Sequence, residues 1–331
     1  MKKLYVSNKF KAYNEKRSES ALKNKKRQET LSKDDLLRKA KRRNKRQFIT
    51  IEAPPKFSIK DNLEECLDLF AEIETRLWNK ERLFIDLSNV HYLTTDVLIY
   101  LLSRLDFFEQ QGRLDVAGNL PNDPDCEKII SASGFYDYMS FKPSQRVSNQ
   151  NILSIKSGSI VQPQVAKEVV NFSLKHLKKD KSLNSMSIYT TLIECMANTK
   201  NHAYHVASEK ISKWWLIALY SKNDNSVKFT FLDNGHGIPK TVRKKVLERL
   251  ISYEDNKLIE SALKGNYLRT QTNQPWRGNG LPKIYNFSKE KQIEDLVVIS
   301  NKGCINCEAD ESKLLGGKRN LNGTLLSWSF V

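Results

Sequence analysis

The sequence predicts an α/β protein of two domains, preceded by a basic tail. Strand-like and helix-like segments alternate over residues 48–150, which is typical of a small α/β layer. A serine-rich stretch at residues 143–159 then indicates a boundary, and a helix, a strand and a glycine turn follow within residues 193–239. A chain of 331 residues is long enough for two domains, each with its own core.

Composition excludes several classes of protein. No run of about eighteen apolar residues occurs, so we expect no membrane span. The N-terminus MKKLYVSNKF lacks the apolar stretch of a secretory signal. Five cysteines in such a chain favour a reducing compartment over a disulfide framework. We therefore expect a cytoplasmic protein.

Residues 1–47 form the basic tail. They hold 18 lysines and arginines against 5 aspartates and glutamates, a net +13 of the chain's +17. Such a polar segment cannot bury enough surface to fold alone, although the basic run at residues 33–46 favours a helix. Contact with the phosphate backbone of a nucleic acid is one interpretation, and a solvated tail is the other.

The segments of residues 48–150 follow in a regular order. Alternating apolar residues predict a strand at 48–54, and apolar residues at helical spacing predict a helix at 62–77. A buried strand at 82–90 precedes a second helix at 97–112, which Gly112 ends. A strand at 113–119 and a short helix ending at Gly134 complete the domain.

This stretch resembles the STAS domain of anti-sigma-factor antagonists, since FIDLSNVHYL, LIYLLSRL, QQGRLDVAG and SGFYDY follow that family's order. The resemblance implies a module that docks a protein partner or forms a homodimer. In the antagonists a partner kinase phosphorylates the first serine of an Asp-Ser-Ser-Gly turn. Here the turn reads Thr94-Thr95-Asp96-Val97, without the family's aspartate and glycine. We therefore expect Thr95, at the acceptor position, to be a helix cap.

Residues 155–331 carry the polar residues that point to chemistry. An amphipathic helix at 165–180 leads into this part. Glu194, Asn198 and His202 are spaced four apart, so on a helix they share one face. Asp233 ends the apolar run FTFL just before a turn rich in glycine and asparagine, where a strand presents a carboxylate at the rim of a sheet.

Four short motifs in this part, ECMAN, DNGHG, RGNGL and NGT, resemble in their order the N box, the G1 box, the G2 box and the final glycine-threonine of the GHKL ATPases. The resemblance implies a Bergerat-fold α/β sandwich that binds ATP and Mg²⁺, with a lid at about residues 239–278. The implied nucleotide-binding residues are Asn198, Asn201, His202, Asp233, Gly235, Gly237, Ile238, Arg277, Gly278, Asn279, Gly280, Leu281 and Thr324.

The chemistry of ATP fits these residue types. A buried carboxylate at Asp233 can accept the amino group of adenine, and the amide oxygen of Asn198 can bind Mg²⁺ without adding charge. Glu194, one helical turn from Asn198, can act as the general base that activates water. A helix that starts behind Gly278 and Gly280 offers N–H groups and a favourable dipole to the phosphates.

Three functions remain open at this point. The first is a Mg²⁺-dependent ATPase whose nucleotide state sets lid closure and the surface shown to a partner. The second is a protein serine/threonine kinase of the anti-sigma type, because STAS and kinase folds are natural partners. The third is a nucleic-acid-binding effector that uses the basic tail and is gated by ATP.

Overall fold

The computed structural model describes residues 47–138, 148–177, 185–202, 213–245, 253–266 and 279–331. Contacts divide the chain into two units, Met1–Ile49 and Thr50–Val331. The second unit is mixed α/β, as the sequence predicts. Residues 1–46 of the basic tail lie outside the described residues, so its helix and its nucleic-acid contacts stay predictions. Within the described ranges, no helix has both the length and the apolar character needed to cross a membrane.

Residues 50–138, here called the N-terminal layer, confirm the predicted alternation of strands and helices. Strands β1 (Ile49–Glu52), β3 (Leu83–Asp86) and β5 (Val116–Gly118) form one sheet in the order β1–β3–β5. Strands β2 (Lys56–Phe57) and β4 (Tyr92–Leu93) form a short parallel pair. The helices are α3 (Leu63–Trp78), α4 (Thr95–Gln110), α5 (Pro124–Ala132) and the 3₁₀ helix η1 (Phe135–Tyr138). Gly112 and Gly134 follow α4 and α5 with positive φ, as expected of glycines that end helices.

Thr95 is not the cap of α4, so that prediction was wrong. The N-cap residue is Thr94, and Thr95 is the first residue of the helix. The Thr95 side chain is buried, and its Oγ1 lies 2.9 Å from the Oγ1 of Thr230 in another strand. Thr94, Thr95 and Asp96 can all cap a helix, so local sequence does not choose among them. The long-range contact with Thr230 accompanies the placement of Thr95 inside the helix.

The rest of the described chain is built on a seven-stranded antiparallel sheet. Its order is β11–β10–β9–β12–β8–β7–β6. The strands are β6 (Ile152–Gly158), β7 (Trp214–Ser221), β8 (Ser226–Asp233), β9 (Glu294–Asn301), β10 (Gly303–Asn306), β11 (Glu311–Leu314) and β12 (Leu321–Phe330). The helices are α6 (Pro163–Leu177), α7 (Ser185–His202), α8 (Ile238–Lys245), α9 (Asp255–Leu263) and α10 (Gly280–Lys289).

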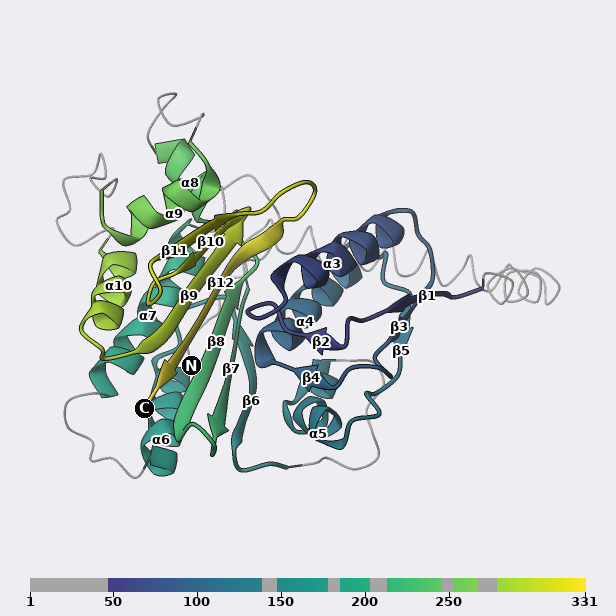
Figure 1. The fold of residues 1–331 in the computed structure, drawn as a ribbon, viewed down its shortest axis with the longest axis horizontal. Helices are drawn as coiled ribbons and strands as arrows, with labels where there is room; N and C mark the ends of the chain where they lie inside the picture. Colours follow the sequence, from purple (N-terminus) through teal and green to yellow (C-terminus); the bar gives the residue numbers. More distant parts are fainter. Residues whose placement is uncertain (1–46, 139–147, 178–184, 203–212, 246–252, 267–278) are drawn as a thin grey trace, which may run out of the picture. The chain divides into compact units, whose positions relative to one another are not determined.

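Both faces of this sheet are buried. Trp214, Leu216 and Ala218 of β7 belong to one apolar core with residues of α6, α7 and α10. Successive side chains of a strand point to opposite faces, so Trp215 and Ile217 lie on the other face. They are also buried, and α4 of the N-terminal layer contacts β7 and β8. Figure 1 shows α6, α7 and α10 on one side of the sheet and α4 on the other. Burial on both faces explains why β7 reads as a continuous apolar run, WWLIAL.

A buried polar cluster joins the N-terminal layer to the start of β12. The Arg104 Nε donates to Glu74 Oε1 at 2.6 Å, and both side chains are largely buried. The Asn322 amide nitrogen donates to both Glu74 oxygens at 3.1 Å, and the Asn322 backbone N–H donates to the Tyr100 hydroxyl. Asn322 directly precedes the Gly-Thr pair of β12, so the N-terminal layer helps to position that pair.

We expect Glu74→Ala to lower the free energy of unfolding by about 3 kcal/mol, because it leaves the buried Arg104 cation without its partner. Chemical denaturation measures the change. The control is Glu72→Ala on the same helix, since Glu72 forms an exposed pair with Arg76 and its loss costs about 0.5 kcal/mol or less. Equal effects of the two variants would contradict the buried cluster.

Candidate functional site

Asp233 lies at the end of β8, between Thr324 of β12 and Trp214 of β7 in register. Its carboxyl is buried, with 9% of the residue exposed. The Gly235 backbone N–H donates to Asp233 Oδ1 at 2.8 Å, and the Thr324 side chain also hydrogen-bonds the carboxylate. Burial outweighs these bonds and raises the pKa of Asp233 to about 6. The structure thus brings together Asp233, Gly235 and Thr324, as the motifs predict.

Three glycines of the motifs make close contacts with their neighbours. Gly237 has φ +87°, and a Cβ there would lie 2.5 Å from Asn301 Oδ1. A Cβ at Gly323 (φ +122°) would overlap the carbonyl oxygen of Asp233. A Cβ at Gly280 would lie 2.7 Å from Glu194 Oε2. Gly237 and Gly323 also have positive φ, which favours glycine, whereas at Gly280 the flexible end of the Glu194 side chain can move aside.

Ser300, at the end of β9, belongs to the site although the motifs do not mark it. Its hydroxyl accepts from the Ile238 backbone N–H and donates to the Gly323 carbonyl, both at 2.9 Å, and it lies 3.1 Å from Thr324 Oγ1. It ties the turn after Asp233 to the Gly-Thr pair. The available signal was the polar pair SN after the apolar run LVVI, which matches the ending of FTFLDN. In the described part of the chain, the buried Oδ1 of Asn301 makes no hydrogen bond.

Helix α7 carries Glu194 and Asn198 on its partly exposed side. Leu192, Cys195 and Met196 of the same helix are buried in the core under the sheet. Glu194 and Asn198, four residues apart, therefore lie along one face at the margin of that core. This confirms the helical spacing that the sequence predicts.

Helix α10 places the G2-like motif against Glu194. Asn279 is its N-cap residue, but the Asn279 side chain makes no capping hydrogen bond, and Gly280 is the first helical residue. The Lys283 Nζ donates to Glu194 Oε1 at 3.0 Å. The structure thus brings Glu194 and Gly280 together, and it adds Lys283, which was not identified from the sequence.

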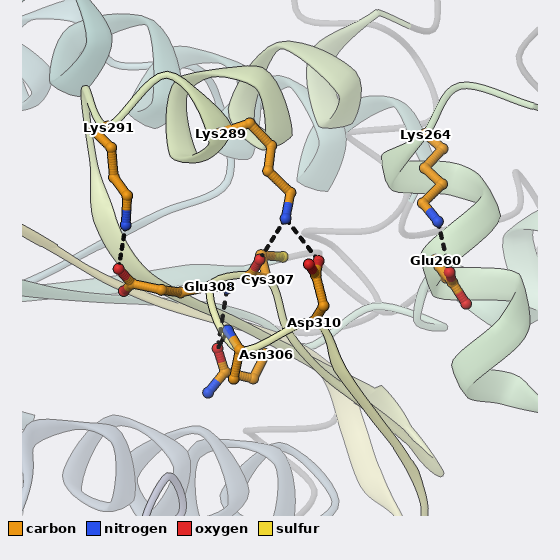
Figure 2. A network of polar contacts seen from close by, with 9 residues as sticks. Glu260, Lys264, Lys289, Lys291, Asn306, Cys307, Glu308 and Asp310 are labelled. Atoms are coloured by element: carbon orange, nitrogen blue, oxygen red, sulfur yellow. Dashed lines mark hydrogen bonds and ion pairs between the residues drawn. The ribbon is translucent and has the colours of Figure 1, made fainter.

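The C-terminal end of α10 is fixed separately. The Lys289 Nζ donates to the Cys307 carbonyl at 2.9 Å and pairs with Asp310 at 2.6 Å (Figure 2). Both partners lie on the β10–β11 hairpin, at the edge of the seven-stranded sheet. Helix α10 therefore has one polar anchor at each end, Lys283 on Glu194 and Lys289 on the hairpin.

Two of the predicted site residues make apolar contacts with helices α8 and α9. Ile238 and Leu281 both pack on a small apolar cluster of Val242, Leu258 and Ala262 in α8 and α9. Of the expected lid, the structure describes only residues 239–245 and 253–266. Arg277 and Gly278 lie outside the described residues, as do the side chains of Asn201 and His202, so their roles stay predictions.

Near the buried Asp233 carboxylate, Gly237 packs against Asn301, and Gly323 packs against the backbone carbonyl of Asp233. A buried carboxylate of this kind can accept a hydrogen bond from a nucleotide base. For Mg²⁺, Asn198 offers one amide oxygen, which suits an ion that takes its other ligands from phosphates and water. The described part of the chain contains no group of three or more His, Cys, Asp or Glu side chains placed to hold a metal ion.

No protein-family model matches this chain. A search of curated proteins likewise gives no match.

Asp233→Asn is expected to stabilise the protein in the absence of nucleotide. The folded-state pKa of about 6 lies above the ordinary value, so the free energy of unfolding falls as the pH rises from about 4 to 6. Asparagine removes this penalty, which amounts to at most about 3 kcal/mol above pH 6.

Denaturation of the two proteins at about pH 4 and about pH 7.5 measures this: the variant should gain stability only at the higher pH. Asp224→Asn is the control, since Asp224 lies in the turn at the other end of the β7–β8 hairpin and is exposed. A variant less stable than the parent at about pH 7.5 would show that the Asp233 carboxylate stabilises the turn instead.

Proposed function

We propose that residues 155–331 form a Bergerat-fold domain of the GHKL type that binds ATP with Mg²⁺ and hydrolyses it, and that the N-terminal layer is a STAS-like module. The observation that carries this proposal is the buried Asp233 carboxylate at a strand end. The Cβ position of Gly323 is filled by the backbone carbonyl of Asp233, and that of Gly237 by Asn301 and Ser300 of β9. A buried carboxylate needs a hydrogen-bond donor, and the amino group of adenine supplies one.

The phosphates would lie near the start of α10. The first N–H groups of a helix have no partner inside the helix, and the helix dipole favours anions there. Glu194 lies against this turn, and in this proposal its carboxylate would orient and deprotonate a water beside the terminal phosphate. Asn198 would hold the Mg²⁺, which neutralises charge on the phosphates when bound.

The N-terminal layer would act as the regulatory partner of this site within the same chain. Its contacts reach Thr230 and Asn322, which lie three residues before Asp233 and one before Gly323. Lys213, whose backbone pairs with that of Asn234, also forms an ion pair with Asp106 of α4. We therefore propose that a change of nucleotide at Asp233 would alter these contacts with the N-terminal layer, so that the protein would act as a nucleotide-controlled switch.

Calorimetry with MgATP tests the proposal directly. We expect binding by the parent protein and a 10- to 100-fold loss of affinity, roughly, in Asp233→Asn, because a hydrogen bond to a charged group is lost. Asp224→Asn should bind as the parent does. Absence of binding by the parent, or full affinity in Asp233→Asn, would disprove the assignment.

Glu194→Gln should retain ATP binding while its turnover falls by about 10²–10⁴-fold, since the amide cannot take a proton from water. Release of phosphate from ATP is the measurement. Labelled ATP that transfers phosphate to protein in place of water would favour the kinase alternative. Unchanged turnover in Glu194→Gln would remove Glu194 as the base.

A further inference from the structure

Among the described residues, Lys283 forms an ion pair with Glu194. The two side chains come from α10 and α7, and the Lys283 Nζ lies 3.0 Å from Glu194 Oε1. The other carboxylate oxygen, Oε2, faces Gly280 in the first turn of α10. The Glu194 carboxylate therefore lies beside the first turn of α10, which is the end of the helix whose dipole favours anions.

We propose that Lys283 is a ligand of the terminal phosphate, and that in the nucleotide-free protein Glu194 holds it in that phosphate's place. This inference rests on the proposed ATP site and names a residue that none of the motifs includes. When a triphosphate binds, Lys283 exchanges the Glu194 carboxylate for a phosphate oxygen. Glu194 is then released to activate water.

The pair has the properties of an exchangeable contact. The Lys283 side chain is 52% exposed and that of Glu194 is 23% exposed. A pair so open to water is weak, and a terminal phosphate carries more charge and more acceptor oxygens than one carboxylate. The Lys283 stem is flexible and ends in three donors that can turn to a new partner.

Lys289 is a lysine on the same helix whose partners do not include Glu194. It bonds the Cys307 carbonyl and the Asp310 carboxylate together, and both partners lie on one hairpin (Figure 2). This anchor stays in place when Lys283 moves, so α10 need not shift during the exchange. Lys289 is therefore the matched control for Lys283.

The exchange gives the site a means to distinguish ATP from ADP. Only a triphosphate offers the terminal phosphate, so only a triphosphate takes Lys283 from Glu194. The general base is thus engaged by Lys283 until the substrate that needs it has arrived. Hydrolysis then depends on the nucleotide that is bound and not only on the presence of Glu194.

The test measures the affinities of a non-hydrolysable MgATP analogue and of MgADP by calorimetry. Lys283→Met should reduce the preference for the triphosphate by about 10- to 100-fold, and Lys283→Arg should restore most of it. Lys289→Met should leave the preference unchanged. An unchanged preference in Lys283→Met, or an equal loss in Lys289→Met, would overturn the proposal.

Glu194→Gln separates phosphate binding from a merely structural pair. If the pair only aligned α7 and α10, Lys283→Met and Glu194→Gln would both weaken the analogue. If Lys283 binds the phosphate, the two variants change the affinity for the analogue in opposite directions. Lys283→Met lowers it, whereas Glu194→Gln raises it, because this variant frees Lys283 and removes a negative charge. Weakening by both variants would refute the exchange.

The outcomes also separate this inference from the ATP site on which it rests. A parent protein that binds neither nucleotide would remove both. A parent protein that binds ATP, loses it in Asp233→Asn and keeps its triphosphate preference in Lys283→Met would remove the role of Lys283 alone.

Discussion

Burial of the seven-stranded sheet on both faces is the constraint on which the rest of this structure depends. Apolar residues of β7 alternate between a core under α6, α7 and α10 and a second core under α4. Neither layer can leave without exposing a wide apolar surface, which costs about 25 cal/mol per Å². This packing holds the strand ends in fixed positions, so the polar residues at those ends are also fixed relative to one another.

The candidate site lies where three central strands end. Asp233 ends β8, Ser300 lies at the end of β9, and Thr324 lies near the start of β12. Hydrogen bonds from Ser300 and Thr324 join these ends, and Gly323 allows β12 to approach Asp233 closely. A rigid frame can keep a carboxylate buried at a free-energy cost that a flexible loop would relieve by exposing it to water. The same burial disfavours the charged form of Asp233 and raises its pKa to about 6.

Local patterns predicted the parts of the fold that local forces determine. Apolar spacing predicted α3, α4 and α6, and glycines marked the ends of α4 and α5. The motifs predicted that Asp233, Gly235 and Thr324 meet, and they do. Periodicity did not predict that α4 packs on β7 and β8. An apolar pattern shows that a helix face is buried, but it does not identify the element that packs against it. The cap of α4 was misplaced by one residue because Thr94, Thr95 and Asp96 can all cap a helix.

Ion pairs between residues far apart in the chain were not predicted from the sequence. Glu194 and Lys283 are 89 residues apart, and Lys283 lies outside the four motifs, so no spacing rule connects them. Glu74 and Arg104 lie in helices that the sequence predicted correctly, yet their burial depends on β12, more than two hundred residues later. Motifs report which residues a site needs, whereas packing decides what each of them contacts before a ligand arrives. For Glu194 that contact is Lys283 on α10, so the surroundings of this proposed base follow from the packing of α7 against α10.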